Sequence, residues 1–250
     1  MNLVLYLPIL TTLFSTFFSY RVFLHYFRRK SGPHLLWWGF GIAIYGLGTL
    51  FESLVTLFGW NPALFRMWYI SGALLGGVPL AQGTVYLLLK RKTANILSSI
   101  LVPFLIFAAA SVLLAPLKEY PFGDKILSGR VLGAPDGSWT WVRFLSPFIN
   151  AYAVIFLIGG AFLSAYRYSK NPATRHRFYG NLLIAVGAIL PGIGGSFSRM
   201  GQTEVLYATE FFGLLLIYRG YRLCVKTSLG ESPQKKVLTT SGGGVYSSAS

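Results

Sequence analysis

The chain has 250 residues, of which 54% are hydrophobic and only 12% are charged, and 22 Lys and Arg residues stand against 7 Asp and Glu residues. A soluble domain of this length cannot cover so much apolar surface with so few charges, so the composition predicts a membrane protein. The single cysteine excludes a disulfide framework and a cysteine-rich metal site.

Apolar stretches of about twenty residues, long enough to cross a bilayer, predict transmembrane helices. Seven such stretches lie at residues 3–26, 35–58, 65–89, 95–115, 141–166, 178–198 and 204–224. The first has no basic leader region and no small-residue cleavage site, so we expect it to be a retained span rather than a signal peptide. The sequence therefore predicts an all-α, seven-helix membrane bundle in one domain, residues 1–227.

Two segments outside the predicted spans are polar. The connection at 117–138 is rich in Gly, Pro and charged residues, which makes it too polar to span and too short to form a domain. The last segment, 228–250, is rich in Ser and Gly and is predicted to be a disordered cytoplasmic tail.

The distribution of Lys and Arg predicts the orientation of the bundle. Most of them follow the first, third, fifth and seventh stretches, and positive residues gather on the cytoplasmic side of a membrane protein. We therefore expect the N-terminus outside and the C-terminus inside, in a bacterial plasma membrane. The basic balance then reflects topology and contact with anionic lipid head groups, and no nucleic-acid partner is expected.

Small residues recur at helical spacing in three of the stretches, 35–58, 65–89 and 178–198, and this pattern predicts close packing at the bundle centre. Gly48 belongs to the first of these faces. Pro79 and Pro191 are expected to bend the other two helices, because proline removes a backbone hydrogen bond. Two interpretations remain open at this point: kinked close packing, or a hinge or cavity in the middle of the membrane.

Glu52 lies inside the second stretch, about six residues or roughly 9 Å below its outer end. An unpaired carboxylate at that depth costs several kcal/mol, so it needs a partner or water. Glu210 lies at a similar depth in the seventh stretch. Arg66, which follows the short turn after the second stretch, is the expected counter-charge.

Other outer residues complete a predicted polar layer. The candidate pocket comprises Glu52, Arg66, Tyr69, Arg143, Arg199, Tyr207 and Glu210, with Trp68 and Trp141 as further aromatic walls. Three interpretations stay open: a structural ion-pair layer, a ligand or ion site that opens to the outside, or charged side chains that extend separately to the head groups. Deeper in the spans, Gln82, Asn150 and Asn181 predict interhelical hydrogen bonds.

Motifs for familiar chemistry are missing from the sequence. His25, His34 and His176 fall near cytoplasmic helix ends and form no HxxxH or HExxH pair. The seventh stretch contains no lysine for a retinal Schiff base, and no GxSxG or phosphate-binding loop occurs. The sequence therefore identifies no catalytic residue, metal site or cofactor and does not favour an enzyme.

Two segments, ESLVTLFGWNPALFRMWYISGALLGGVPLAQGTVYLL at 52–88 and NLLIAVGAILPGIGGSFSRMG at 181–201, resemble an uncharacterised family of bacterial seven-transmembrane-helix proteins. That resemblance implies a bacterial membrane protein and carries no activity with it.

Four functions fit the sequence. The first is a sensor or ligand-binding protein with an outer-facing polar pocket, which would signal through a partner protein. The second is a small secondary transporter that uses a membrane-embedded carboxylate and has Pro79 and Pro191 as gates. The others are a lipid-modifying enzyme, for which neither a nucleophile nor a metal is evident, and a structural subunit without a ligand.

Overall fold

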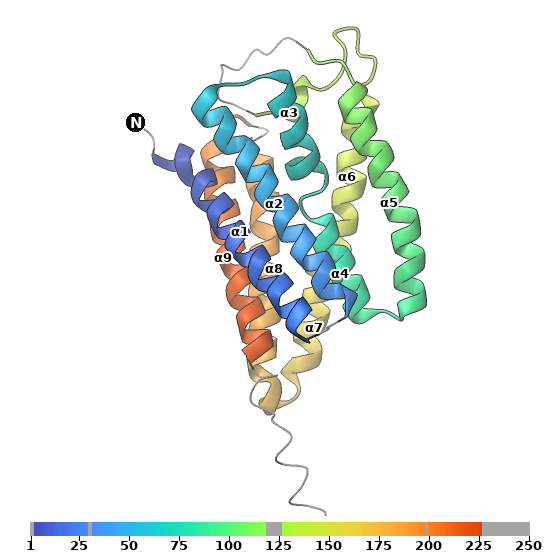
Figure 1. Ribbon diagram of the computed structural model, residues 1–250, viewed down its shortest axis with the longest axis vertical. Coiled ribbons are helices and arrows are strands. Elements are labelled where there is room, and N and C mark those ends of the chain that lie inside the picture. The colour runs from blue at the N-terminus through green and yellow to red at the C-terminus, as the bar shows by residue number, and fades with distance from the viewer. Residues whose placement is uncertain (1–2, 30–31, 119–126, 199, 227–250) are drawn as a thin grey trace, which may run out of the picture.

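The computed structural model describes residues 3–29, 32–118, 127–198 and 200–226. In these residues the chain forms long helical rods that lie side by side along one axis (Figure 1). The rods are η1–α1 (Leu3–Tyr6, Leu7–Arg29), α2 (Pro33–Phe58), α3–η2 (Pro62–Trp68, Tyr69–Leu74) with α4 (Val78–Leu88), α5 (Arg91–Leu114), α6–η4–α7 (Trp141–Ala153, Val154–Gly159, Gly160–Ser169), η5–α8 (Pro172–Thr174, Arg175–Ser198) and α9 (Thr203–Lys226). Each predicted span falls on one of these rods. The predicted tail at 228–250 lies outside the described residues.

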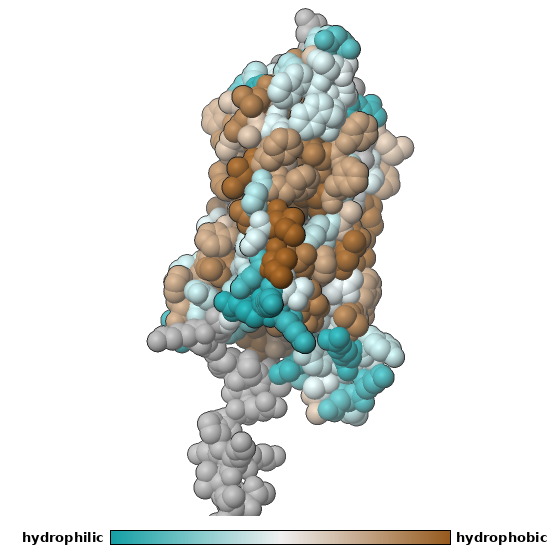
Figure 2. All heavy atoms as spheres, turned by 90° about the vertical axis from the view of Figure 1, so that its right-hand side faces the viewer, coloured by the Kyte–Doolittle hydropathy of each residue, from teal (hydrophilic) through white to brown (hydrophobic). Residues whose placement is uncertain are grey.

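Six of the described rods are long and apolar enough to cross a membrane, and they comprise every rod before α9. The chain is therefore a multi-pass membrane protein. Helix α9 has 24 residues, enough to span, but it is not apolar enough to join that set. On the face that it displays, Figure 2 shows a broad apolar zone across the middle of the molecule, with hydrophilic residues gathered toward the lower end and further ones at the upper end.

We name the two ends of the bundle the upper end and the lower end, as they lie in Figure 1. The upper end carries the α2–α3 turn and the segment 127–140, and the lower end carries the α4–α5 and α7–α8 turns. The segment 127–140 covers part of the upper end. Its Leu127, Val131 and Leu132 are buried in one apolar cluster with residues of α2, α3 and α5. An antiparallel bridge between Leu117 and Leu132 fastens it to the end of α5.

The third rod is interrupted in the middle of the bundle. A π-helical segment, Tyr69–Leu74, follows α3, and residues 75–77 leave the helix before α4 begins at Val78. Pro79 lies in the first turn of α4, where a missing N–H costs nothing. The bend expected at Pro79 is thus a full break, which precedes the proline. Helix α8, by contrast, continues through Pro191.

The sequence predicted that the glycines of α8 would face the bundle centre. They do not. They pack along α9 instead, where a Cβ added to Gly187 would lie 2.6 Å from the carbonyl oxygen of Gly213. Gly180 and Gly220 make a similar close approach near the lower end. α2 and the third rod form the buried centre, whereas α8 is among the least buried rods.

Candidate functional site

A cavity of about 1060 Å³ occupies the upper half of the bundle. One face of each of α2, α6–η4, α8 and α9 lines it, together with the broken part of the third rod and residues 127–130. On α2 the lining residues fall on one helical face, at Ile42, Tyr45, Gly48 with its neighbour Thr49, and Glu52. The stripe predicted from the sequence therefore faces this cavity.

The cavity is bounded on one side by helices that diverge. Helix α8 packs mainly against α9, α7 and η4, and α6 is not among its main partners. Phe144 and Pro147 of α6 and Gly192 and Ile193 of α8 line the cavity and are exposed. The upper halves of α6 and α8 therefore leave a side opening at membrane depth.

Glu52 and Glu210 meet on the wall of this cavity. Their carboxyl groups contact each other across α2 and α9. Glu52 is only 2% exposed, and its Oε1 accepts a hydrogen bond of 2.9 Å from Trp68 Nε1. The Oε2 atoms of both glutamates are buried and accept no hydrogen bond from any other residue, so only a proton shared between the two carboxyl groups would join them. Tyr45, about two helical turns below Glu52, donates to the backbone oxygen of Glu210 at 3.1 Å.

Close backbone contact brings the groups of this site together. A Cβ added to Gly48 would lie 3.0 Å from the Cα of Gly72, so α2 and the π-helical segment approach as closely as backbones can. That approach lets Trp68 reach across to Glu52, which lies one turn above Gly48. Any larger residue at Gly48 would push the two rods apart.

The broken rod also supplies backbone groups to the cavity wall. Gly72, Ala73, Gly76 and Gly77 line the cavity. The carbonyl oxygen of Ala73, freed by the irregular helix, accepts hydrogen bonds from Ser146 Oγ at 2.9 Å and from Asn150 Nδ2 at 3.1 Å. Two side chains of α6 thus stabilise the break, and the interhelical bond predicted for Asn150 is confirmed.

Of the three predicted arginines, Arg66 does not lie where the sequence placed it. Arg66 Nη2 donates to the backbone oxygen of Ala115 at 2.7 Å, at the end of α5, and it does not pair with Glu52. The expected Glu52–Arg66 pair is therefore wrong. The reason is geometric: Arg66 and Trp68 are two residues apart on one helix, so when Trp68 faces α2, Arg66 faces away from it. Arg143 does line the cavity, and Arg199 lies outside the described residues.

The aromatic candidates divide in the same way. Tyr69 and Trp68 are buried and line the cavity. Tyr207 is buried but lies outside the cavity lining, and Trp141 is exposed and stacks near Phe107 and Trp139. No sequence pattern indicated that Ser128 and Arg130 would line the cavity or that Trp68 would bond to Glu52, because each depends on how separate segments pack.

The residues present favour the binding of a cation or a hydrogen-bond donor at the carboxyl pair. Among the described residues no cluster of three His, Cys, Asp or Glu side chains could hold a metal ion. Two carboxylates in contact repel each other unless a proton, a cation or an ammonium group lies between them. No protein-family model, no curated protein and no solved structure matches the chain.

Proposed function

We propose that the protein is a ligand-binding membrane protein whose upper cavity binds a positively charged ligand, either a monovalent cation or a primary ammonium group, at Glu52 and Glu210. One observation carries the proposal: two buried carboxyl groups in contact, each with one oxygen that lacks a hydrogen-bond partner, on the wall of a cavity of about 1060 Å³. A polar pair that served only to hold helices together would have its oxygens bonded to protein groups.

The proposal includes an orientation and a helix count. We place the upper end outside a bacterial plasma membrane, because most Lys and Arg residues lie toward the lower end. We count α9 as a seventh span, because it packs along α8 and carries Glu210 to the depth of Glu52. The resemblance to bacterial seven-helix membrane proteins supports the same arrangement.

Trp68 provides a reporter for the test, since its indole N–H is bonded to Glu52. Methylammonium chloride, titrated into the detergent-solubilised protein at constant ionic strength, should change tryptophan emission in a saturable way. Trp68→Phe should lose that change, which identifies the reporter. Glu52→Gln and Glu210→Gln should each weaken binding about tenfold or more, because they remove a charge from a desolvated site.

The matched control is Glu204→Gln, which changes an exposed glutamate in the first turn of the same helix as Glu210. This variant should titrate like the wild type. Equal affinity in the Glu210→Gln and Glu204→Gln variants, or the absence of any saturable response to methylammonium and to sodium, would overturn the proposal.

A further inference from the structure

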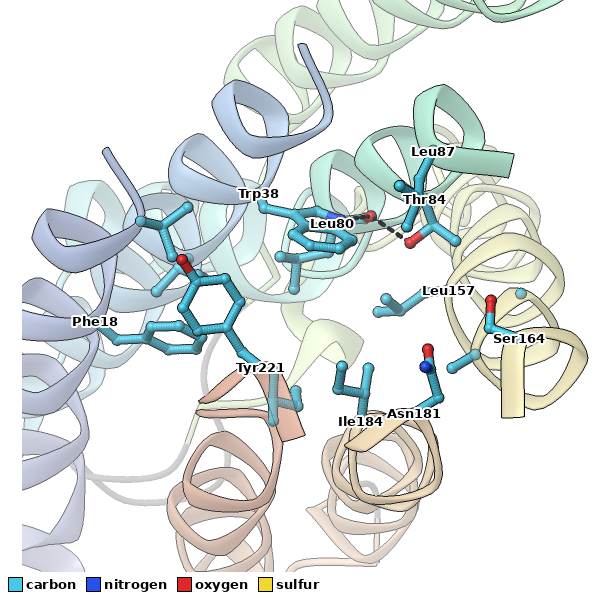
Figure 3. Close-up of a pocket in the computed structure, with 15 residues that line it drawn as sticks. Phe18, Trp38, Leu80, Thr84, Leu87, Leu157, Ser164, Asn181, Ile184 and Tyr221 are labelled. Carbon is cyan, nitrogen blue, oxygen red and sulfur yellow. Dashed lines mark hydrogen bonds between the residues drawn. The ribbon is translucent and has the colours of Figure 1, made fainter. Parts of the chain in front are cut away.

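A second, smaller pocket lies directly below the upper cavity. Its volume is about 50 Å³, and α1, α2, α4, α7, α8 and α9 contribute side chains to it, including Trp38, Ser164, Asn181 and Tyr221. Figure 3 shows these side chains around one central space, with Leu157 reaching into it. Trp38 Nε1 and Thr84 Oγ1 both donate to the backbone oxygen of Leu80 at its edge. This lower pocket reaches toward the end of the bundle opposite to the segment 127–140.

Four side chains line both spaces. They are Ile42 of α2, Leu80 of α4, Leu157 of η4 and Ile217 of α9. The upper cavity and the lower pocket therefore adjoin, and a single aliphatic layer separates them. We call these four residues the apolar layer.

The apolar layer is closed in this structure. Ile42, Leu80 and Leu157 are buried and belong to one core cluster, and Ile217 packs against it. A constriction of aliphatic side chains excludes water and therefore blocks ions without any charged group. Gly41 keeps it tight, because a Cβ there would lie within 2.9 Å of Leu80 side-chain atoms.

Two members of the layer are attached to irregular backbone. Leu80 lies in the first turn of α4, immediately after the break at residues 75–77. Leu157 lies inside the π-helical segment Val154–Gly159. π-helical turns are frequent at functional sites, and transporters often bind their substrates at broken helices. Short irregular segments can also absorb the backbone dihedral changes of a hinge. The layer is thus placed where two rods can change shape with few hydrogen bonds lost.

We propose that the protein transports its cation: the ligand binds at Glu52 and Glu210, the apolar layer opens, and the ligand leaves through the lower pocket. This inference rests on the proposed function, and it adds a path and an activity to the binding site. The cargo is a compact monovalent cation, a proton or a small primary ammonium, because the path narrows to four aliphatic side chains and the lower pocket offers only neutral polar groups. The structure then represents a state in which the closed apolar layer separates the binding site from the lower pocket.

Proteoliposomes that contain the full chain test the path, with uptake of radiolabelled methylammonium as the measure of cation flux and an internal pH dye as the measure of the proton leak. An external pulse of methylammonium in its protonated form should give a saturable flux in the wild-type protein, and Glu52→Gln should abolish it. Leu80→Ala should add a leak that does not saturate and exceeds the basal proton leak by about tenfold, which corresponds to about 1.4 kcal/mol of barrier. Leu157→Ala provides a second variant of the layer, in case Leu80→Ala does not fold.

Leu74→Ala is the matched control. Leu74 is as deeply buried as Leu80 and lies on the same rod, but it lines neither the upper cavity nor the lower pocket. It should lose stability without gaining a leak. Saturable methylammonium binding in detergent with no flux in proteoliposomes would overturn the transport inference and leave the proposed function standing. Absence of methylammonium binding would overturn both the transport inference and the proposed function. Equal proton leaks in Leu74→Ala and Leu80→Ala would show that the apolar layer is not the gate.

Discussion

Gln82 and the Glu52–Glu210 pair are both polar groups inside apolar spans, yet their surroundings are opposite. Gln82 is fully buried, and its Nε2 donates to Ala94 O at 3.2 Å and to Ser98 Oγ at 2.7 Å. Its Oε1 accepts from the hydroxyl of Tyr152. Both amide hydrogens and the amide oxygen are therefore hydrogen-bonded, and the side chain joins α4, α5 and α6.

The carboxyl pair has no such set of partners. One oxygen of each glutamate lacks a hydrogen bond, and the pair faces a cavity rather than packed protein. A satisfied buried network makes the fold specific and rigid, whereas an unsatisfied pair is unfavourable until something binds it. From this difference we infer that a polar residue in a span is structural when protein groups supply its hydrogen bonds and functional when they do not.

We expect the largest loss of stability when the hydrogen bonds of Gln82 are removed. Gln82→Leu would remove the side chain that bonds to the Ala94 carbonyl, Ser98 and Tyr152 at once, so the free energy of unfolding should fall by about 3 kcal/mol. Denaturant unfolding in detergent measures it. Ser99→Ala removes a hydroxyl that bonds within its own helix and should change little. If Gln82→Leu lost no more free energy of unfolding than Ser99→Ala, the Gln82 network would not be a stabilising element.

The opposite sign is expected at the carboxyl pair. Glu52→Gln removes the need to hold a proton or a cation between two carboxyl groups and keeps an acceptor for Trp68, so stability should rise by about 1 kcal/mol while cation binding weakens. The same unfolding assay, run beside the methylammonium titration, checks both halves. Destabilisation of the size expected for Gln82→Leu would show that the pair is a structural element.

A smaller effect is expected where Trp68 supports Glu52. Trp68→Phe removes the one donor to Glu52 Oε1 and should cost about 1–2 kcal/mol. In a Glu52→Ala background this cost should shrink, giving a coupling energy of about 1 kcal/mol in a double-mutant cycle. Additive effects would mean that the tryptophan acts only through packing.

The smallest coupling is expected between Glu52 and Arg66. Because Arg66 bonds to Ala115 O at the end of α5, Glu52→Gln and Arg66→Gln should be additive within about 0.5 kcal/mol. Thermal unfolding of the two single variants and the double variant measures the cycle. Strong coupling would restore the ion pair that the sequence suggested.

Much of the helix arrangement could be predicted, because hydrophobic length and residue spacing are local properties. The predicted spans match the rods to within a few residues, and the stripe through Gly48 and Glu52 does face the interior. Glu210 was expected at the depth of Glu52, and counting residues from the helix ends sufficed for that. The interhelical bond of Gln82 followed from the cost of burying an amide.

The arrangement of the site was less predictable. The break at residues 75–77 is stabilised by Ser146 and Asn150, which lie more than seventy positions away on another rod. The sequence showed a proline there, but a proline is compatible with a kink as well as with a new helix start. The choice of Trp68 rather than Arg66 as the partner of Glu52 depended on the rotation of α3 about its axis.

Hydrophobic length alone predicts a helical membrane protein, the residues that fill its apolar spans, and two carboxyl groups at one depth inside them. Depth follows from counting along a helix of fixed rise, so it needs no knowledge of neighbouring helices. That these carboxyl groups touch, that they face a cavity, and that four aliphatic side chains close its floor could be read only from the packed bundle. Those facts depend on which helix faces meet, and in lipid that choice is made by close backbone packing at small residues rather than by hydrophobic contrast.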